Sequence, residues 1–263
     1  MELIDTHCHI DIEAFDEDRY EVLDRCQDEG VTKIVVPGIE AETWDRLGKM
    51  CDELPGLYPA FGLHPVYVEQ HSDEDLVELE MRLQQGNPVA VGEIGLDFFY
   101  FDTKNKDLTE SIKERQMNLF EAQLKLAQST SLPVIMHVRK AHDAALSVLR
   151  RNSIVGGICH AFNGSLEQAH HYIDMGFKLG FGGMLTYERS HKLHRLAQQL
   201  PIESIVLETD SPDMTVSSHH GERNSPEYLP ECLAALAELR DEDAASIAAQ
   251  TTANAYDVFS FSQ

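Results

Sequence analysis

The chain has 263 residues, of which 43% are hydrophobic, and its formal net charge is −24. It contains no apolar run of the roughly 18 residues that a membrane helix needs, so we expect no membrane span. The acidic charge argues against a long duplex bound along an exposed face, because such a surface repels phosphate backbones. A phosphate-bearing substrate stays compatible with this charge if a deep site holds bound cations.

The five cysteines are scattered along the chain without a Cys-x-x-Cys pair: Cys8, Cys26, Cys51, Cys159 and Cys232. An odd, unpatterned set in a chain of this length indicates a reducing compartment and no disulfide framework. The N-terminus leads from Met1-Glu2 directly into a strand-like segment and lacks the basic and apolar pattern of a secretory signal. We therefore expect a cytoplasmic protein.

Short apolar or β-branched runs alternate with segments of helical spacing along the chain. The eight strand-like runs cover residues 2–7, 32–38, 57–64, 89–96, 132–138, 154–162, 177–183 and 204–210. Helical spacing predicts helices at about 16–29, 41–53, 73–85, 109–129, 141–151, 165–175, 189–200 and 226–239, with a last helix near 242–258. In the clearest of these, residues 109–129, Thr109 is a candidate N-cap.

Several strand runs are apolar on both faces, which is typical of buried parallel strands. Eight strand–helix repeats in a chain of 263 residues predict a (β/α)8 TIM barrel, forming a single domain over residues 1–263. A doubly wound open sheet is the alternative, because a count of strands does not prove that the sheet closes.

Histidine and acidic side chains end six of these runs, and the carboxyl ends of the strands are where barrels place their active sites. They are His7 and His9, His64, Glu93, His137, His160, and Glu208 with Asp210. Residues two apart in a strand point to the same face, so His7 and His9 can bind one ion, with Asp5 below them as a hydrogen-bond acceptor. Glu208 and Asp210 share a face by the same rule.

The candidate ligands are nitrogen and carboxylate donors without cysteine, which favours a catalytic metal over a structural thiolate zinc site. They exceed the needs of one catalytic zinc, so we expect two divalent ions, with zinc, manganese, magnesium and nickel as candidates. We predict that His7, His9 and Asp210 hold one ion, that His137 and His160 hold the other, and that Glu93 bridges them. A single strand-end histidine is more often an ordinary hydrogen-bonded residue, but the combination at one end favours metal binding.

Nine motifs follow one another over the whole chain: DTHCH, GLHP, VGEIGLDFF, MHVRKA, CHAFNGS, LGFGG, LETDSP, GERNSP and TTANAYDVF. In this order they resemble the TatD family of metal-dependent hydrolases. The resemblance implies a (β/α)8 barrel related to the amidohydrolases, a divalent two-metal site and deoxyribonuclease activity. It also implies the metal ligands, which are His7, His9, Glu93, His137, His160 and Asp210.

The chain departs from the family's pattern in two places. Residues 161–165 read Ala-Phe-Asn-Gly-Ser where the family has Cys-Phe-Ser-Gly-Ser, and Asp213-Met214 stands where the family has an aromatic residue. Neither departure changes a metal ligand. Both lie where substrate would be contacted, so they bear on the identity of the substrate more than on hydrolysis.

The predicted catalytic residues are Asp210, as the acid–base group, and Glu93, as the bridge between ions that activate water. Candidate phosphate-binding residues are His64, Arg139 and Arg223, together with a helix N-terminus at which Ser165 and Gln168 have capping-box spacing. The aromatic residues Phe98, Phe99, Tyr100 and Phe101 have two interpretations: they stack an unpaired base, or they pack the loop onto the barrel rim.

We predict a metal-dependent phosphodiesterase that trims nucleic-acid ends or short single strands, with no membrane and no obligate protein partner. A hydrolase of amides, lactones or other carboxylic esters is the alternative, because a two-metal site attacks carbonyl carbon as well as phosphorus. A metal-stabilised binding protein is a third interpretation, but it leaves unexplained why the ligands ring a barrel mouth.

Overall fold

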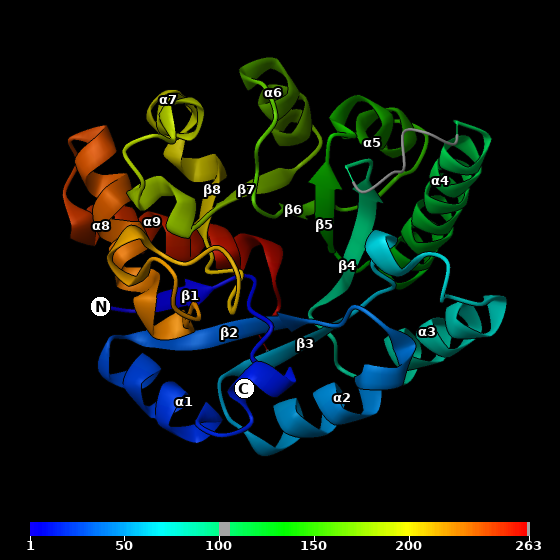
Figure 1. Ribbon diagram of the computed structural model, residues 1–263, viewed down its shortest axis with the longest axis horizontal. Coiled ribbons are helices and arrows are strands. Elements are labelled where there is room, and N and C mark those ends of the chain that lie inside the picture. Colours follow the sequence, from blue (N-terminus) through cyan, green and yellow to red (C-terminus); the bar gives the residue numbers. More distant parts are fainter. Residues whose placement is uncertain (100–105, 262–263) are drawn as a thin grey trace.

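The computed structural model describes residues 1–99 and 106–261. In this part of the chain, eight parallel strands form one sheet in chain order, and helices surround it (Figure 1). The strands are β1 (Leu3–Asp5), β2 (Val31–Pro37), β3 (Leu57–Phe61), β4 (Ala90–Asp97), β5 (Val134–Arg139), β6 (Gly157–Cys159), β7 (Phe177–Phe181) and β8 (Ile205–Leu207). Each strand falls on one of the predicted runs.

The helices alternate with the strands as the spacing predicts. They are α1 (Arg19–Asp28), α2 (Trp44–Glu53), α3 (Asp73–Gln85), α4 (Lys106–Thr130), α5 (His142–Leu149), α6 (Leu166–Asp174), α7 (His191–Gln199), α8 (Leu229–Arg240) and α9 (Ala244–Val258). Short 3-10 turns lie at Glu13–Phe15, Ala41–Thr43, Pro65–Tyr67, Gly183–Thr186, Ile202–Ser204, Ser217–His219 and Pro226–Tyr228. None of the helices described here is long and apolar enough to span a membrane, and the five cysteines are free.

Two helix starts were predicted from capping patterns, with different outcomes. Ser165 and Gln168 form the predicted capping box at the start of α6. Thr109 is not an N-cap, because α4 already begins at Lys106. The sequence Lys-Asp-Leu at 106–108 contains no helix breaker, so nothing stops the helix from starting one turn earlier.

The barrel closes between β1 and β8 through both backbone and side-chain hydrogen bonds. The amide and the hydroxyl of Thr6 both donate to the carbonyl oxygen of Leu207, at 3.1 and 3.0 Å. The Asp5 carboxylate accepts the amide of Thr209 at 3.0 Å and its hydroxyl at 2.6 Å. Eight parallel strands thus form a nearly closed barrel, and the open doubly wound sheet is rejected.

The interior of the barrel is filled by small apolar side chains below the mouth. This cluster contains Ile4, Val35, Ala60, Ala90, Ile135, Ile158 and Val206, with Phe259 from the segment that follows α9. A larger apolar cluster packs the outer faces of the strands against the helices. This apolar layer lies directly below the polar residues of the mouth.

Candidate metal centre

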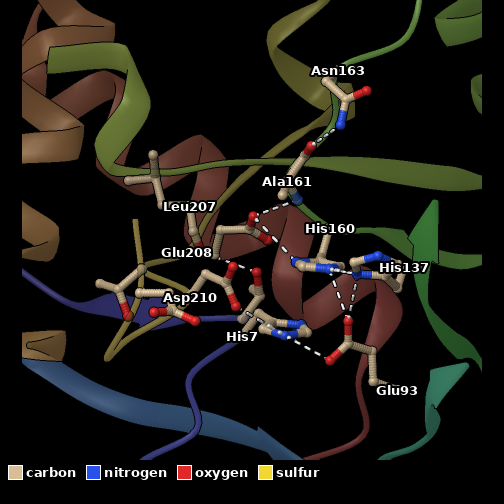
Figure 2. A network of polar contacts seen from close by, with 12 residues as sticks. His7, Glu93, His137, His160, Ala161, Asn163, Leu207, Glu208 and Asp210 are labelled. Carbon is tan, nitrogen blue, oxygen red and sulfur yellow. Dashed lines mark hydrogen bonds and ion pairs between the residues drawn. The ribbon is translucent and has the colours of Figure 1, made fainter. Parts of the chain in front are cut away.

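Glu93 is the carboxylate that connects the histidines of a polar cluster, and dashed lines in Figure 2 join its oxygens to His7, His137 and His160. Only 2% of its side chain is exposed, and its two oxygens face different imidazoles. Oε2 lies 3.3 Å from His7 Nε2 and 3.4 Å from His9 Nε2. Oε1 lies 3.1 Å from His137 Nδ1 and 2.9 Å from His160 Nε2. One carboxylate therefore joins two pairs of histidines.

Strand alternation explains why these side chains gather in one layer. Ile135, Ile158 and Val206 belong to the apolar interior, and the residues two positions later point to the same face. Those residues are His137, His160 and Glu208. The polar cluster therefore lies directly above the apolar interior, which buries it from below.

Asp210 reaches the cluster from the loop after β8. Its backbone has φ +56°, in the left-handed region that aspartate tolerates better than most residues. Oδ1 lies 3.4 Å from His7 Nε2 and 3.8 Å from His9 Nε2. Glu208 contacts different groups: its Oε1 accepts the Ala161 amide at 2.6 Å and lies 3.9 Å from His160 Nδ1.

His64, a predicted substrate-binding residue, also lies in the cluster. Its Nε2 is 3.2 Å from Glu93 Oε1, and its Nδ1 accepts the amide of Val66 at 3.2 Å. Because Nδ1 is an acceptor, the proton of the neutral ring resides on Nε2, which donates to Glu93. His64 is thus a hydrogen-bond donor at the edge of the cluster.

Asp97 is a site residue that sequence reasoning did not single out. Its Oδ2 accepts a hydrogen bond from His137 Nε2 at 3.0 Å, which leaves His137 Nδ1 facing Glu93. Asp97 ends β4, four positions after Glu93. Residues four apart in a strand share a face, so this spacing was the signal that could have found it.

Asp5 is fully buried below His7 but contacts the backbone of that residue. Its Oδ1 accepts the His7 amide at 3.2 Å, in addition to the two donors from Thr209. The Nδ1 atoms of His7, His9 and His160 are buried and have no hydrogen-bond partner among the described residues. Asp5 is thus a hydrogen-bond acceptor below His7, but its donors are the amides of His7 and Thr209 and the Thr209 hydroxyl, and not an imidazole.

Burial and mutual charge set the pKa values of the cluster. Burial raises the pKa of Asp5 to about 7 and that of Glu208 to about 8. Burial acts in the same direction on Glu93, but the surrounding imidazoles outweigh it and hold its pKa well below the usual range. In His9 and His137 burial lowers the pKa, but neighbouring carboxylates outweigh it and raise the pKa to about 9. The cluster thus centres on an ionised carboxylate.

The donor spacings fit divalent metal ions. Bonds of about 2.0–2.1 Å to a tetrahedral zinc place the ligand atoms about 3.3 Å apart. His7 Nε2 and His9 Nε2 are 3.2 Å apart, and His137 Nδ1 and His160 Nε2 are 3.1 Å apart. Three groups have all their donor atoms within 4.8 Å of one another: His7–His9–Glu93, His64–Glu93–His137 and His7–His160–Asp210. The first two groups lie on the two sides of Glu93 and fit metal binding there, whereas the third joins His160 to His7 and Asp210 across the two sides.

The cluster opens into a cavity of about 700 Å³. Arg139, which the sequence suggested as a substrate contact, lines this cavity, and apolar walls come from residues such as Phe162, Phe181 and Met184. Arg223 is not among the described lining residues. Its guanidinium makes two hydrogen bonds of 2.7 Å to the Asp18 carboxylate. Of the predicted aromatic residues, Tyr100 and Phe101 lie outside the described residues.

A parallel barrel with histidines and carboxylates gathered at its mouth is the architecture of barrel metal-dependent hydrolases. The model of the family described as TatD related DNase matches residues 4–260. The chain belongs to the TatD family and is a metal-dependent hydrolase, as its motifs indicated.

Individual relatives cover nearly the whole chain. It is 42% identical over 259 residues to the uncharacterized metal-dependent hydrolase YjjV of Escherichia coli K12, covering 97% of each protein. It is 32% identical over 253 residues to the 3′-5′ ssDNA/RNA exonuclease TatD of Pantoea sp. At-9b, covering 93% of this chain and 94% of the relative. The crystal structure of E. coli YjjV matches with a TM-score of 0.92 at 41% identity, over 99% of this chain and 98% of that one.

Proposed function

We propose that this protein is a two-metal phosphodiesterase that removes nucleotides from the ends of single-stranded nucleic acid. The observation that carries the proposal is the position of Glu93, whose two oxygens face different histidine pairs at spacings suited to divalent ions. His7, His9 and Asp210 would hold one ion, and His137 and His160 the other. The name of the Pantoea relative, a 3′-5′ ssDNA/RNA exonuclease, supports this class of substrate.

When bound, the ions supply Lewis-acid polarisation of a phosphoryl oxygen and a water of lowered pKa. Asp210 takes the proton of the attacking water at its carboxylate and returns it to the leaving oxygen. Burial raises the pKa of Asp210, which makes it a stronger base than an exposed aspartate. Its side chain is 16% exposed and lines the cavity, so it is accessible to water.

His64 and Arg139 are the proposed contacts of the non-bridging phosphate oxygens, since both line the cavity. His64 Nε2 lies 3.2 Å from Glu93 Oε1, and its N–H is the donor that a phosphate oxygen would share. Arg223 is not among these proposed contacts, because the Asp18 carboxylate binds its guanidinium. Its role as a substrate contact remains a prediction from the sequence. A variant of Arg223 tests it below.

The proposal is tested with short single strands labelled at the 3′ end and with protein reconstituted with Mg²⁺, Mn²⁺ or Zn²⁺. We expect release of labelled nucleotide, loss of this activity in Asp210→Asn, and no change in Asp174→Asn, an exposed acid on α6. Cleavage no greater than that of Asp210→Asn with all three metals would contradict the proposal. Turnover of carboxylic esters or lactones without nucleotide release would favour the alternative hydrolase.

A further inference from the structure

A second cavity, of about 720 Å³, lies beside the metal cavity. The two share Arg139, Asn163 and Leu193 as lining residues, so one ligand can extend from one cavity into the other. The second cavity is formed by the segments that follow β4, β5 and β6 and by the start of α7. It contains none of the proposed metal ligands.

Cationic side chains gather in the second cavity, although the chain has 45 acidic and only 21 basic residues. Arg139, Lys140 and Lys192 line it. Neither lysine has an ion-pair partner within residues 1–99 and 106–261, and the Lys192 ammonium donates to the carbonyl oxygen of Asn163. Asp143, the carboxylate in the described lining, instead accepts the side-chain amide of Gln168 at 2.7 Å. The two lysines therefore remain available to an anion.

This arrangement is unfavourable until an anion binds. Burial, together with the charge of Lys140, lowers the pKa of Lys192. Lys140 has φ +58°, in a backbone region that residues other than glycine seldom adopt. Strain of this kind is concentrated at binding sites. An anion between the two ammonium groups would relieve their repulsion.

An aromatic platform adjoins the lysines. Phe99 lines the second cavity and is 50% exposed. The guanidinium of Arg139 lies 3.8 Å from the centroid of its ring. A large exposed aromatic ring backed by a planar cation is the kind of surface on which an unpaired base stacks. The cavity thus combines sites for a phosphate and for a base.

We propose that the second cavity binds the nucleotide adjacent to the one being removed, with its phosphate between Lys140 and Lys192 and its base on Phe99. The inference rests on the proposed function and adds the path of the nucleic acid. The bound single strand would run from the metal cluster, past Asn163, to the start of α7. It predicts that the protein prefers strands long enough to reach this cavity. A small diester that fills only the metal cavity would not contact the second cavity, so its rate of cleavage should not depend on the lysines there.

The test compares the double variant Lys140→Gln/Lys192→Gln with the charge-matched control Lys49→Gln/Lys125→Gln, whose lysines are exposed at 75% and 66% on α2 and α4. Substrates are bis(p-nitrophenyl) phosphate and labelled single strands of two to six nucleotides, with the Mn²⁺-reconstituted protein. We expect the double variant to lose about tenfold in kcat/KM on the longer strands and to keep its rate on the small diester. The control variant should match wild type on both.

Salt dependence gives a second readout. Loss of the one phosphate that the two lysines hold should reduce the slope of log affinity against log salt by about 0.7 for a single strand. Phe99→Ala should lower kcat/KM on longer strands without changing that slope, because it removes stacking and no charge. Equal loss on short and long substrates, or an unchanged preference for length, would overturn the subsite.

A binding experiment separates this inference from the proposed function. Fluorescence anisotropy of a labelled hexanucleotide is measured on Asp210→Asn, with and without the two lysine substitutions. Binding that depends on the lysines supports the subsite even if wild type cleaves no phosphodiester, a result that would overturn only the nuclease function. Binding that is indifferent to the lysines overturns the subsite whatever the cleavage assay shows.

Discussion

The two sides of the metal cluster are held in place differently. His137 has a carboxylate hydrogen-bonded behind its ring, with Asp97 Oδ2 at 3.0 Å from Nε2, whereas Glu208 lies 3.9 Å from His160 Nδ1, too far for a hydrogen bond. The Nδ1 atoms of His7 and His9 have no such partner in the part of the chain described. On that side the backbone amides of the histidines make the hydrogen bonds instead. The His7 amide donates to the Asp5 carboxylate at 3.2 Å, and the His9 amide donates to the Ser211 carbonyl oxygen at 2.8 Å.

This difference indicates what each side depends on. The Asp97 hydrogen bond fixes the orientation and tautomer of the His137 ring before any ligand binds. The rings of His7 and His9 owe their positions to the β1–β8 seam that fixes their backbone. The first side should therefore respond to loss of a single acid, and the second to loosening of the seam.

Glu93→Gln should have the largest effect because it removes the group that joins the two sides. We expect kcat to fall by more than about 100-fold, beyond the range typical of a residue that only supports a ligand. Metal content measured by mass spectrometry should fall as well. Full activity with two bound ions would contradict the role of Glu93 as a bridge.

Asp97→Asn should weaken metal binding on the His137 side alone. We expect a loss of about 10- to 100-fold in the affinity for one ion, while the other is retained. Isothermal titration calorimetry with the metal resolves the binding of the two ions, with Asp174→Asn as the matched control. An equal loss at both sites would show that the two sides are not independent.

Thr209→Val loosens the seam while keeping the shape of the side chain. It leaves a buried oxygen of Asp5 without its donor at 2.6 Å, so we expect the free energy of unfolding to fall by about 2 kcal/mol. Denaturant unfolding of the metal-free protein measures this. Thr251→Val is the control, because the Thr251 hydroxyl donates to the carbonyl of Ile247 within helix α9. A smaller loss in Thr209→Val than in the control would contradict the structural role of the seam.

The metal-free protein should lose stability as the pH rises from about 6.5 to 9. His9 and His137 have folded-state pKa values of about 9, above their ordinary value of 6.5. The folded state therefore holds up to two more protons than the unfolded chain across this window, and its stability falls by about 1.4 kcal/mol per pH unit for each extra proton. Thermal unfolding across this range measures the slope. Asp97→Asn should make it shallower because it lowers the pKa of His137.

Arg223→Gln should have the smallest effect on catalysis. Asp18 binds the guanidinium outside the described cavity lining, so we expect kcat/KM to stay within roughly twofold and stability to change by no more than about 1 kcal/mol. Steady-state kinetics on the labelled strands measure the first quantity. A large rise in KM would instead support the substrate contact predicted from sequence.

The gathering of the candidate ligands could be predicted because parallel strands end at one mouth and because residues two apart share a face. That reasoning found His7, His9, His137 and His160. It missed Asp97 because the run was ended at Leu96, whereas β4 extends to Asp97 with a register shift between Val91 and Ile94. Nor could a local pattern show the partner of Arg223, because Asp18 lies 205 positions away in the chain.

The seam has a further consequence for how the protein is made. The hydrogen bond from the Thr209 amide to Asp5 joins residues 204 positions apart, and the next residue is Asp210. The segment that closes the barrel therefore also brings the proposed acid–base group. We therefore expect a chain that stops before this segment to be inactive, because it lacks both the closing contacts of the barrel and the proposed acid–base group.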